Sequence, residues 1–320
     1  MTTTPTPTAP TPAGASLREA LQATDRRRRR TDLTMRVLII GAFVLAMIPL
    51  LSLTWTVVSR GIGRLDSYFL LNSMRGVFGG MDAGGIYHAI VGTLEITLFA
   101  ALISVPIGLL AAIYLVEYGN GRPLAKLVTF LVDVMTGIPS IVAGLFAYAL
   151  FALILGPGAK FGAIGSVALS VLMIPVVIRS SEEMLRLVPN ELREASLALG
   201  VPRWLTIIKV VLRTSVAGLT TGVMLAIARV IGETAPLLLT VGVVDSINFN
   251  LFEGRMMTLP VYVYRQYAQG LVPCSDGDAS CIPDINLQRA WAAALTLFLI
   301  VMVLNLIGRL VTRLFAPKIR

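Results

Sequence analysis

Charged residues are scarce in this sequence. Only 14% of its 320 residues are Asp, Glu, Lys or Arg, whereas 56% are hydrophobic and the mean hydropathy is +0.80. Soluble domains carry about 25% charged residues, so this composition could not cover a water-exposed surface of ordinary size. The scarcity of charge excludes an ordinary soluble domain and indicates a protein whose solvent is largely a lipid bilayer.

Motifs for intrinsic chemistry are also absent. The sequence contains no G-x-x-x-x-G-K-[ST] loop for a nucleotide, no HExxH motif and no paired His/Cys spacing for a metal. Its single histidine, His88, has no neighbours that would complete a catalytic triad. We therefore expect no catalytic residue, no metal site and no cofactor bound by this chain.

Long apolar runs take the place of the missing charge. About 20 apolar residues in a helix cross a hydrocarbon core of about 30 Å. The sequence predicts an all-α polytopic membrane protein whose six transmembrane helices lie within residues 35–316. The predicted spans are residues 37–59, 89–116, 131–155, 161–178, 211–244 and 290–311.

The basic residues predict the orientation of these spans. With the N-terminal arm inside, 18 basic residues fall in inner segments and 7 in outer segments. The positive-inside rule then places both termini in the cytoplasm. Residues 1–34 are expected to form a disordered basic arm, residues 317–320 a cytoplasmic tail and residues 245–289 an outer loop. Because membrane orientation accounts for the net charge of +9, we expect no nucleic-acid partner.

Cysteine is nearly absent, and both cysteines fall in the predicted outer loop. Cys274 and Cys281 are separated by a short polar stretch. Outside the cytoplasm this spacing permits a disulfide that closes a small loop, and two free thiols are the alternative.

The polar segment 180–209 lies between the fourth and fifth predicted spans. Pro189 and Asn190 precede acidic residues, and Gly200 follows. This order predicts a short helix with Asn190 as its N-cap and Gly200 at its end. The helix is too short and too charged to cross a bilayer. By its pattern alone, an interfacial loop helix is the favoured interpretation.

The residues of this segment resemble the EAA motif of bacterial ABC importer permeases. Glu194-Ala195-Ser196 is followed by Gly200, with Ser196 in place of the motif's second alanine and Arg213 where many members have proline. The resemblance implies a coupling helix that docks in a cleft of a cytoplasmic ATPase subunit. It assigns this coupling role to Glu191, Arg193, Glu194, Ala195 and Gly200.

Three further stretches resemble the PstA-type subunits of phosphate-specific ABC importers: residues 226–236 (AIARVIGETAP), 137–146 (GIPSIVAGLF) and 81–86 (MDAGGI). The resemblance implies a MetI-like permease in a bacterial inner membrane, forming half of a phosphate pore. The implied partners are a homologous PstC-type permease, two PstB-type ATPases that bind ATP and Mg, and a PstS-type extracytoplasmic phosphate-binding protein. The chain would then be a transporter subunit and not an enzyme.

Arg229 and Glu233 are charges inside the fifth predicted span. A charge there costs about 2.5 to 3.5 kcal/mol, so each should face protein or water and find a partner. Their i, i+4 spacing permits a direct salt bridge with a purely structural role. Alternatively, Arg229 attracts phosphate in the substrate pathway and Glu233 weakens that attraction enough for the ion to leave.

Two other functions remain open on the sequence. The chain could be an ABC permease for another oxyanion or small solute, or a secondary transporter or channel that uses Arg229 and Glu233 as an ion relay. The EAA-like helix separates the last of these from the ABC permeases, because a secondary transporter needs no ATPase dock.

Overall fold

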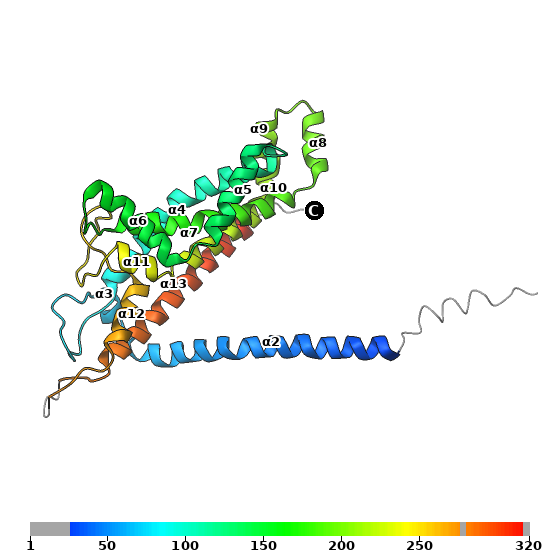
Figure 1. Cartoon of the computed structure of the whole chain (residues 1–320). Coiled ribbons are helices and arrows are strands. Elements are labelled where there is room, and N and C mark those ends of the chain that lie inside the picture. The colour runs from blue at the N-terminus through cyan, green and yellow to red at the C-terminus, as the bar shows by residue number, and fades with distance from the viewer. Residues whose placement is uncertain (1–25, 276–279, 316–320) are drawn as a thin grey trace, which may run out of the picture. The chain divides into compact units, whose positions relative to one another are not determined.

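The computed structural model describes residues 26–275 and 280–315, and their regular structure is helical throughout (Figure 1). Five of these helices are long and apolar enough to cross a membrane, and a bent helix pair raises the number to six. The predicted all-α membrane fold is confirmed. The chain divides into two units, residues 1–56 and 57–320, which are described separately.

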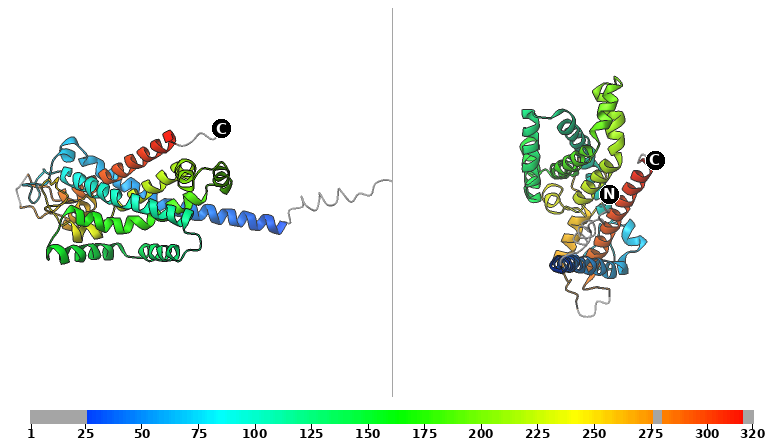
Figure 2. Two further views of the ribbon diagram at one scale, coloured as in Figure 1. Left: turned by 90° about the horizontal axis from the view of Figure 1, so that it is seen from above. Right: turned by 90° about the vertical axis from the view of Figure 1, so that its right-hand side faces the viewer.

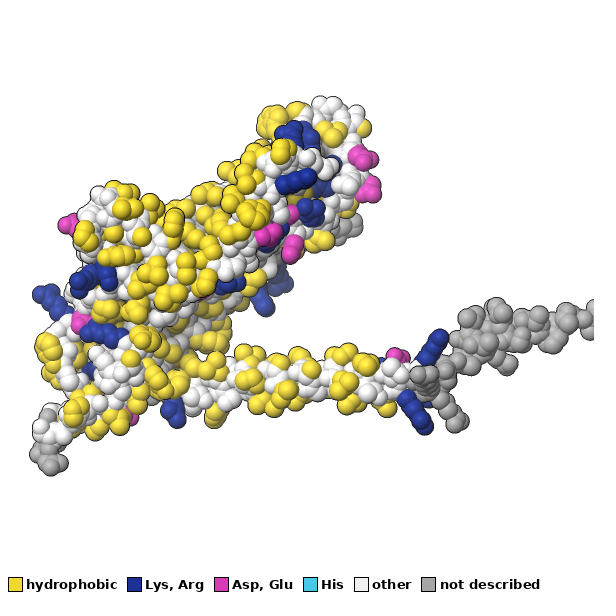
Figure 3. All heavy atoms as spheres, viewed as in Figure 1, with side chains coloured by type: hydrophobic (Ala, Val, Ile, Leu, Met, Phe, Trp, Pro, Cys, Tyr) yellow, Lys and Arg dark blue, Asp and Glu magenta, His cyan; other side chains and the backbone are white. Residues whose placement is uncertain are grey.

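Helix α2 (Arg26–Gly61) supplies the described part of the first unit. It begins within the segment predicted to be disordered, so residues 26–34 are helical. Arginine is a good helix former, and neither glycine nor proline occurs between residues 26 and 40. The apolar side chains of α2 are exposed along its length, as expected for a lipid-facing span (Figure 3). The remainder of the predicted arm, residues 1–25, lies outside the described residues.

Helices α4 (Tyr87–Ile113) and α7 (Gly162–Arg186) form the centre of the second unit. The Ser166 hydroxyl donates to the carbonyl of Ile96 at 3.1 Å, and the Ser170 hydroxyl donates to that of Ala100 at 3.4 Å. Both pairs are 70 residues apart, so the two helices run parallel. Small residues that let helix backbones approach are typical of membrane packing. Helix α7 continues to Arg186, beyond the predicted end of its span at residue 178.

The third predicted span, 131–155, is not one straight helix. Helices α5 (Pro123–Thr136) and α6 (Ser140–Leu155) meet at an angle of 108°. Pro139 causes the break, because it disfavours helical geometry at the residue before it and has no N–H for the helix ladder. Hydropathy registered the apolar run but not this bend.

The fifth predicted span, 211–244, is also interrupted. A π-helical turn (Ile207–Leu212) leads into α10 (Arg213–Val230), and α11 (Ala235–Thr240) follows after a four-residue break. The exposed Gly232 lies in this break, and Pro236 lies in the first turn of α11. Glycine weakens a helix and proline is tolerated only at its start, so both residues favour the interruption.

The short elements gather at the two ends of the helix bundle formed by residues 57–320 (Figures 1 and 2). One end carries α8 (Asn190–Ala198) and α9 (Arg203–Thr206). The other carries a 3-10 turn (Ile62–Arg64), α3 (Ser67–Leu71) and α12 (Leu259–Gln269). The predicted outer loop, 245–289, therefore contains α12, and the last helix, α13 (Ile285–Phe315), begins five residues before its predicted span. Figure 3 shows apolar side chains over the helix bodies of this unit.

Candidate functional site

The loop between α7 and α10 projects α8 from the end of the bundle (Figure 1). Pro189 is the N-cap of α8, and Asn190, predicted to be the cap, is the first helical residue. The proline ring presets an angle that suits a residue just before a helix, and the structure gives Pro189 φ −59° and ψ 141°. The Asn190 side chain accepts a hydrogen bond from Arg193 Nη1 at 3.2 Å instead.

Gly200 ends α8 as the sequence predicted. Its φ of +78° is left-handed, a conformation that costs other residues free energy. Its N–H donates to the carbonyl of Leu197 at 2.9 Å, and the N–H of Val201 donates to that of Ser196 at 3.3 Å. These two bonds form a Schellman motif, which satisfies the last carbonyls of the helix and turns the chain back toward α9.

The outward face of α8 and its flanks is a mixed acidic and apolar surface. Glu191, Glu194 and Ala195 are exposed, as the coupling hypothesis requires. Leu199 is 84% exposed and Trp204 is 59% exposed. Exposed large apolar side chains at a polar end of a membrane protein are typical of a protein-protein contact. We call this surface, with Leu197, the coupling tip.

Arg193 differs from the other residues assigned to coupling, because its side chain points into the protein. It forms an ion pair with Glu117 in the π-helical turn that ends α4 (Tyr114–Tyr118), with Nη2 at 2.9 Å and Nε at 3.0 Å from Oε1. It also donates to the carbonyls of Leu185 and Val188 near the end of α7, at 3.0 Å and 2.5 Å. Arg193 therefore joins α8 to both central helices.

Two further contacts hold the coupling segment at the end of α4. Arg203 donates to the backbone carbonyl of Glu117, and its guanidinium lies 5.1 Å from the centre of the Tyr118 ring. The hydroxyls of Ser196 and Thr206 are hydrogen-bonded at 2.9 Å and buried. A movement of α8 must therefore strain the end of α4. Glu117 was not among the predicted site residues, because its only signal in the sequence is a lone acid at the end of a long apolar run.

Arg229 and Glu233 do not form the predicted i, i+4 pair. Arg229 lies in the last turn of α10, whereas Glu233 lies in the break before α11, so the two are not on one continuous helix. Among the described residues, no ion pair joins them. Arg229 is exposed in the single chain and Glu233 is partly exposed. The described residues therefore do not contain the salt bridge between Arg229 and Glu233 that a purely structural role would require.

The packing of α10 on α7 shows how far along the bundle Arg229 lies. Gly218 and Gly222 lie so close to Met184 and Ser180 that an added Cβ would be only 2.4 and 2.6 Å from them. The α7 residue number falls by four as the α10 number rises by four, so the helices are antiparallel. The same register places Arg229 level with about residue 173, near the middle of α7.

The glycine and proline motifs around this break lie against each other. Gly144 of α6 approaches Pro236 of α11 so closely that an added Cβ would lie 2.6 Å from its Cα. Any side chain at Gly144 would therefore displace α11. The motifs at residues 137–146 and 226–236, noted separately in the sequence, therefore meet at this contact, three residues after Glu233.

The end of the bundle that carries α12 is held by a buried arginine. Arg289 of α13 is 1% exposed and donates through Nη2 to the carbonyls of Met81 at 2.7 Å and Ala83 at 2.8 Å. Arg64 also donates to the Ala83 carbonyl, at 3.3 Å. Burial raises the pKa of the nearby Tyr262 hydroxyl in α12, with Arg289 and Arg64 opposing this, so Tyr262 stays neutral. The motif at residues 81–86 is thus fixed through its backbone.

Cys274 and Cys281 form a disulfide, with Cα atoms 5.8 Å apart. Its Cys281 end lies against residue 80, because the N–H of the next residue, Ile282, donates to the Gly80 carbonyl at 2.8 Å. A Cβ at Gly80 would lie 2.3 Å from the Cys281 sulfur. The disulfide is therefore in contact with residue 80 and Arg289 with residues 81 and 83, so both hold the segment that precedes α4.

The apolar helices long enough to cross a membrane, with the exposed helix α8 at one end, define a multi-pass membrane protein. The chain belongs to the family described as binding-protein-dependent transport system inner membrane component, which matches residues 104–320. Among its relatives is the phosphate transport system permease protein PstA 1 of Mycobacterium tuberculosis (strain H37Rv), 44% identical over 89% of this chain and 88% of that protein. PstA of Pasteurella multocida is 38% identical over 84% of this chain and 91% of that protein.

Solved structures agree on the fold. A bacterial alginate ABC transporter chain, solved in complex with its alginate-bound periplasmic protein, aligns with a TM-score of 0.58 and 13% identity. The alignment covers 90% of this chain and 96% of that one. A chain of the MetNI methionine ABC transporter aligns with a TM-score of 0.54 and 19% identity, over 73% and 95% of the two chains.

Proposed function

We propose that this chain forms half of the translocation pore of an ATP-driven importer of inorganic phosphate. The observation that carries the proposal is its likeness, over most of its length, to permeases that are named for phosphate transport. The coupling tip supports the ATP-driven class, since a secondary transporter or channel has no use for an ATPase dock. An importer of another oxyanion is the alternative that an uptake assay must exclude.

The proposed assembly contains partners that supply what this chain lacks. A homologous PstC-type permease completes the pore, and two PstB-type ATPases bind ATP and Mg and hydrolyse the nucleotide. A PstS-type protein delivers phosphate to the end that carries α12. The excess of basic residues at the α8 end supports cytoplasmic termini in a bacterial inner membrane.

In this assembly an ATPase binds the coupling tip through Glu191, Glu194, Ala195 and the exposed leucines. Arg193 then transmits the movement of α8 to α4 and α7 through the contacts already described. Gly200 sets the direction in which the helix faces the ATPase. Coupling therefore depends on two sets of residues, one that binds the ATPase and one that holds α8.

Arg229 and Glu233 belong to the substrate pathway in this proposal. The exposed Arg229 lies on a face of α10 that the chain itself does not cover, so the homologous permease would enclose it in the pore. Its guanidinium donates in a fork that fits two phosphate oxygens. Glu233 follows the helix break, where a carboxylate repels phosphate and limits how tightly the ion is held.

Phosphate uptake by the assembled transporter in proteoliposomes tests this function. We expect uptake of labelled phosphate, but not of sulfate, that requires ATP and phosphate-loaded binding protein. Arg229→Lys should lower uptake by about tenfold or more, because a bidentate charged hydrogen bond is lost. Glu233→Gln should hold phosphate too tightly and also slow its passage.

Arg213→Lys is the matched control, since Arg213 is an exposed arginine at the opposite end of the same helix. It should leave uptake unchanged. Normal uptake by both pathway variants in an intact assembly would contradict the roles of Arg229 and Glu233. Uptake of sulfate in place of phosphate would contradict the substrate.

A further inference from the structure

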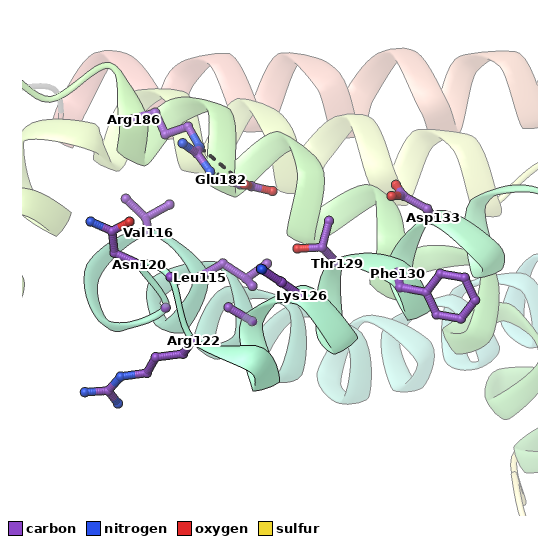
Figure 4. A pocket seen from close by; sticks show the side chains of 13 residues that line it. Leu115, Val116, Asn120, Arg122, Lys126, Thr129, Phe130, Asp133, Glu182 and Arg186 are labelled. Carbon is purple, nitrogen blue, oxygen red and sulfur yellow. Dashed lines mark hydrogen bonds and ion pairs between the residues drawn. The ribbon is translucent and has the colours of Figure 1, made fainter.

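A pocket of about 630 Å³ opens at the α8 end of the bundle, outside the coupling tip and away from Arg229. It lies between the end of α4, the first turns of α5 and the end of α7 (Figure 4). Its walls are apolar at Leu115, Val116 and Phe130 and charged at Arg122, Lys126 and Arg186. A pocket with both kinds of wall suits an amphiphilic ligand.

The acidic groups of the pocket already have cationic partners. Glu182 accepts from Arg179 at 3.1 Å and from Arg186 at 2.7 Å. Asp133 forms an ion pair with Arg179. These two acids and two arginines balance one another, so the carboxylates do not neutralise any further cation.

Arg122 and Lys126 supply the excess positive charge. Neither has an ion pair with an acidic residue among the described parts of the chain, and both side chains are exposed. In Figure 4 the Lys126 amine points toward the space between α4 and α7, whereas Arg122 extends outward from the rim, away from Lys126. Both residues line the pocket, so its mouth carries two positive charges that have no acidic partner in the described parts of the chain.

The surface beside these cations is apolar. Phe130 is 62% exposed, Leu127 is 52% exposed and Leu124 is 54% exposed, all on α5. In a membrane such side chains face acyl chains, while neighbouring lysine and arginine reach the headgroup region. A free anion would contact only the cations, whereas a phospholipid would contact both kinds of surface.

We propose that this pocket binds the headgroup of an anionic phospholipid, with its phosphate at Arg122 and Lys126 and an acyl chain along Phe130. The proposal rests on the proposed function only for the orientation that puts this end at the cytoplasmic leaflet. Basic pockets between helices on that side are suited to anionic headgroups. The bound lipid lies beside Glu117, since Leu115 and Val116 immediately precede it.

Quenching of a tryptophan reporter by brominated lipid tests the site without any transport assay. The full chain carries Phe130→Trp, with Trp55, Trp204 and Trp291 changed to phenylalanine, and circular dichroism checks its helicity. It is placed in phosphatidylcholine nanodiscs that contain brominated phosphatidylglycerol or, at the same mole fraction, brominated phosphatidylcholine. We expect stronger quenching by phosphatidylglycerol.

Arg122→Gln and Lys126→Gln should each weaken this preference by about fivefold. The control is Arg309→Gln with Arg313→Gln, two exposed arginines near the end of α13, which should leave the preference intact. Equal quenching by the two lipids, or an equal loss in the control, would overturn the proposal. Displacement of phosphatidylglycerol by dissolved inorganic phosphate would also overturn it, by assigning the pocket to the free anion.

The result is independent of uptake. Loss of the lipid preference in an otherwise active phosphate transporter would contradict the lipid site alone. An intact lipid preference in a chain that supports no phosphate uptake would contradict the proposed function alone.

Discussion

An arginine holds the elements together at each end of the bundle, but the two arginines bind different partners. At the α8 end Arg193 reaches a carboxylate, Glu117, and the segment that it holds is exposed. At the α12 end Arg289 reaches the carbonyls of Met81 and Ala83, beside a disulfide. Hydrogen bonds to neutral backbone carbonyls, together with a disulfide, suit a part of the protein that stays fixed. The ion pair between Arg193 and Glu117 suits a contact that transmits movement from α8 to the end of α4, because the two residues can be displaced together.

Breaking the ion pair between Arg193 and Glu117 should have the largest effect on transport. Glu117→Ala leaves Arg193 partly buried without its counter-ion, which costs about 3 to 5 kcal/mol for a buried pair. We expect ATP hydrolysis to continue while phosphate uptake falls by at least about tenfold. The measurement is the ratio of phosphate imported to ATP hydrolysed by the assembled transporter.

Two variants sharpen that result. Glu117→Gln keeps an acceptor oxygen for Arg193 and should retain part of the coupling. Glu194→Lys at the exposed tip should weaken ATPase binding instead, whereas Glu183→Lys, an exposed acid of α7 outside the tip, should not. Wild-type coupling in Glu117→Ala would show that Arg193 holds α8 without transmitting force.

Removing Arg289 at the α12 end should mainly lower stability. Arg289→Leu removes two charge-assisted hydrogen bonds to the part-buried carbonyls of Met81 and Ala83, worth about 1.5 to 3 kcal/mol each. We expect a lower midpoint of thermal unfolding and a near-normal ratio of phosphate to ATP in the protein that remains folded. A changed ratio with unchanged stability would reverse the contrast between the two ends.

Opening the disulfide should have a smaller effect of the same kind. Cys274→Ser with Cys281→Ser removes a link across a sequence separation of 7, worth about 2 to 3 kcal/mol in the chain-entropy estimate. Thermal unfolding with and without a reductant measures the loss. The reductant should shift the midpoint of the wild type but not that of the double variant.

Gly200→Ala should have the smallest effect on stability, about 1 kcal/mol, because alanine resists the left-handed backbone at the end of α8. We expect a modest fall in coupling and no change at the α12 end of the bundle. Gly200→Asn should be milder, since asparagine tolerates this conformation better. Equal coupling in all three proteins would mean that the direction of α8 is set elsewhere.

The sequence by itself determined the features that depend on neighbouring residues. Hydropathy located the apolar runs, and the order of proline, acids and glycine located α8 and its left-handed end at Gly200. The residues of the EAA-like segment and of the phosphate-permease-like stretches were sufficient to indicate the family. Each of these signals can be read within a short window of the chain.

Only the tertiary structure decided how distant residues meet. It set the angle of 108° between α5 and α6, left Arg229 without an ion pair to Glu233 among the described residues, and turned Arg193 inward to Glu117, 76 residues away. A charge pattern gives spacing along a helix, but not where the helix breaks or what packs against it. Those outcomes depend on contacts such as Gly144 with Pro236, whose geometry comes from two different segments.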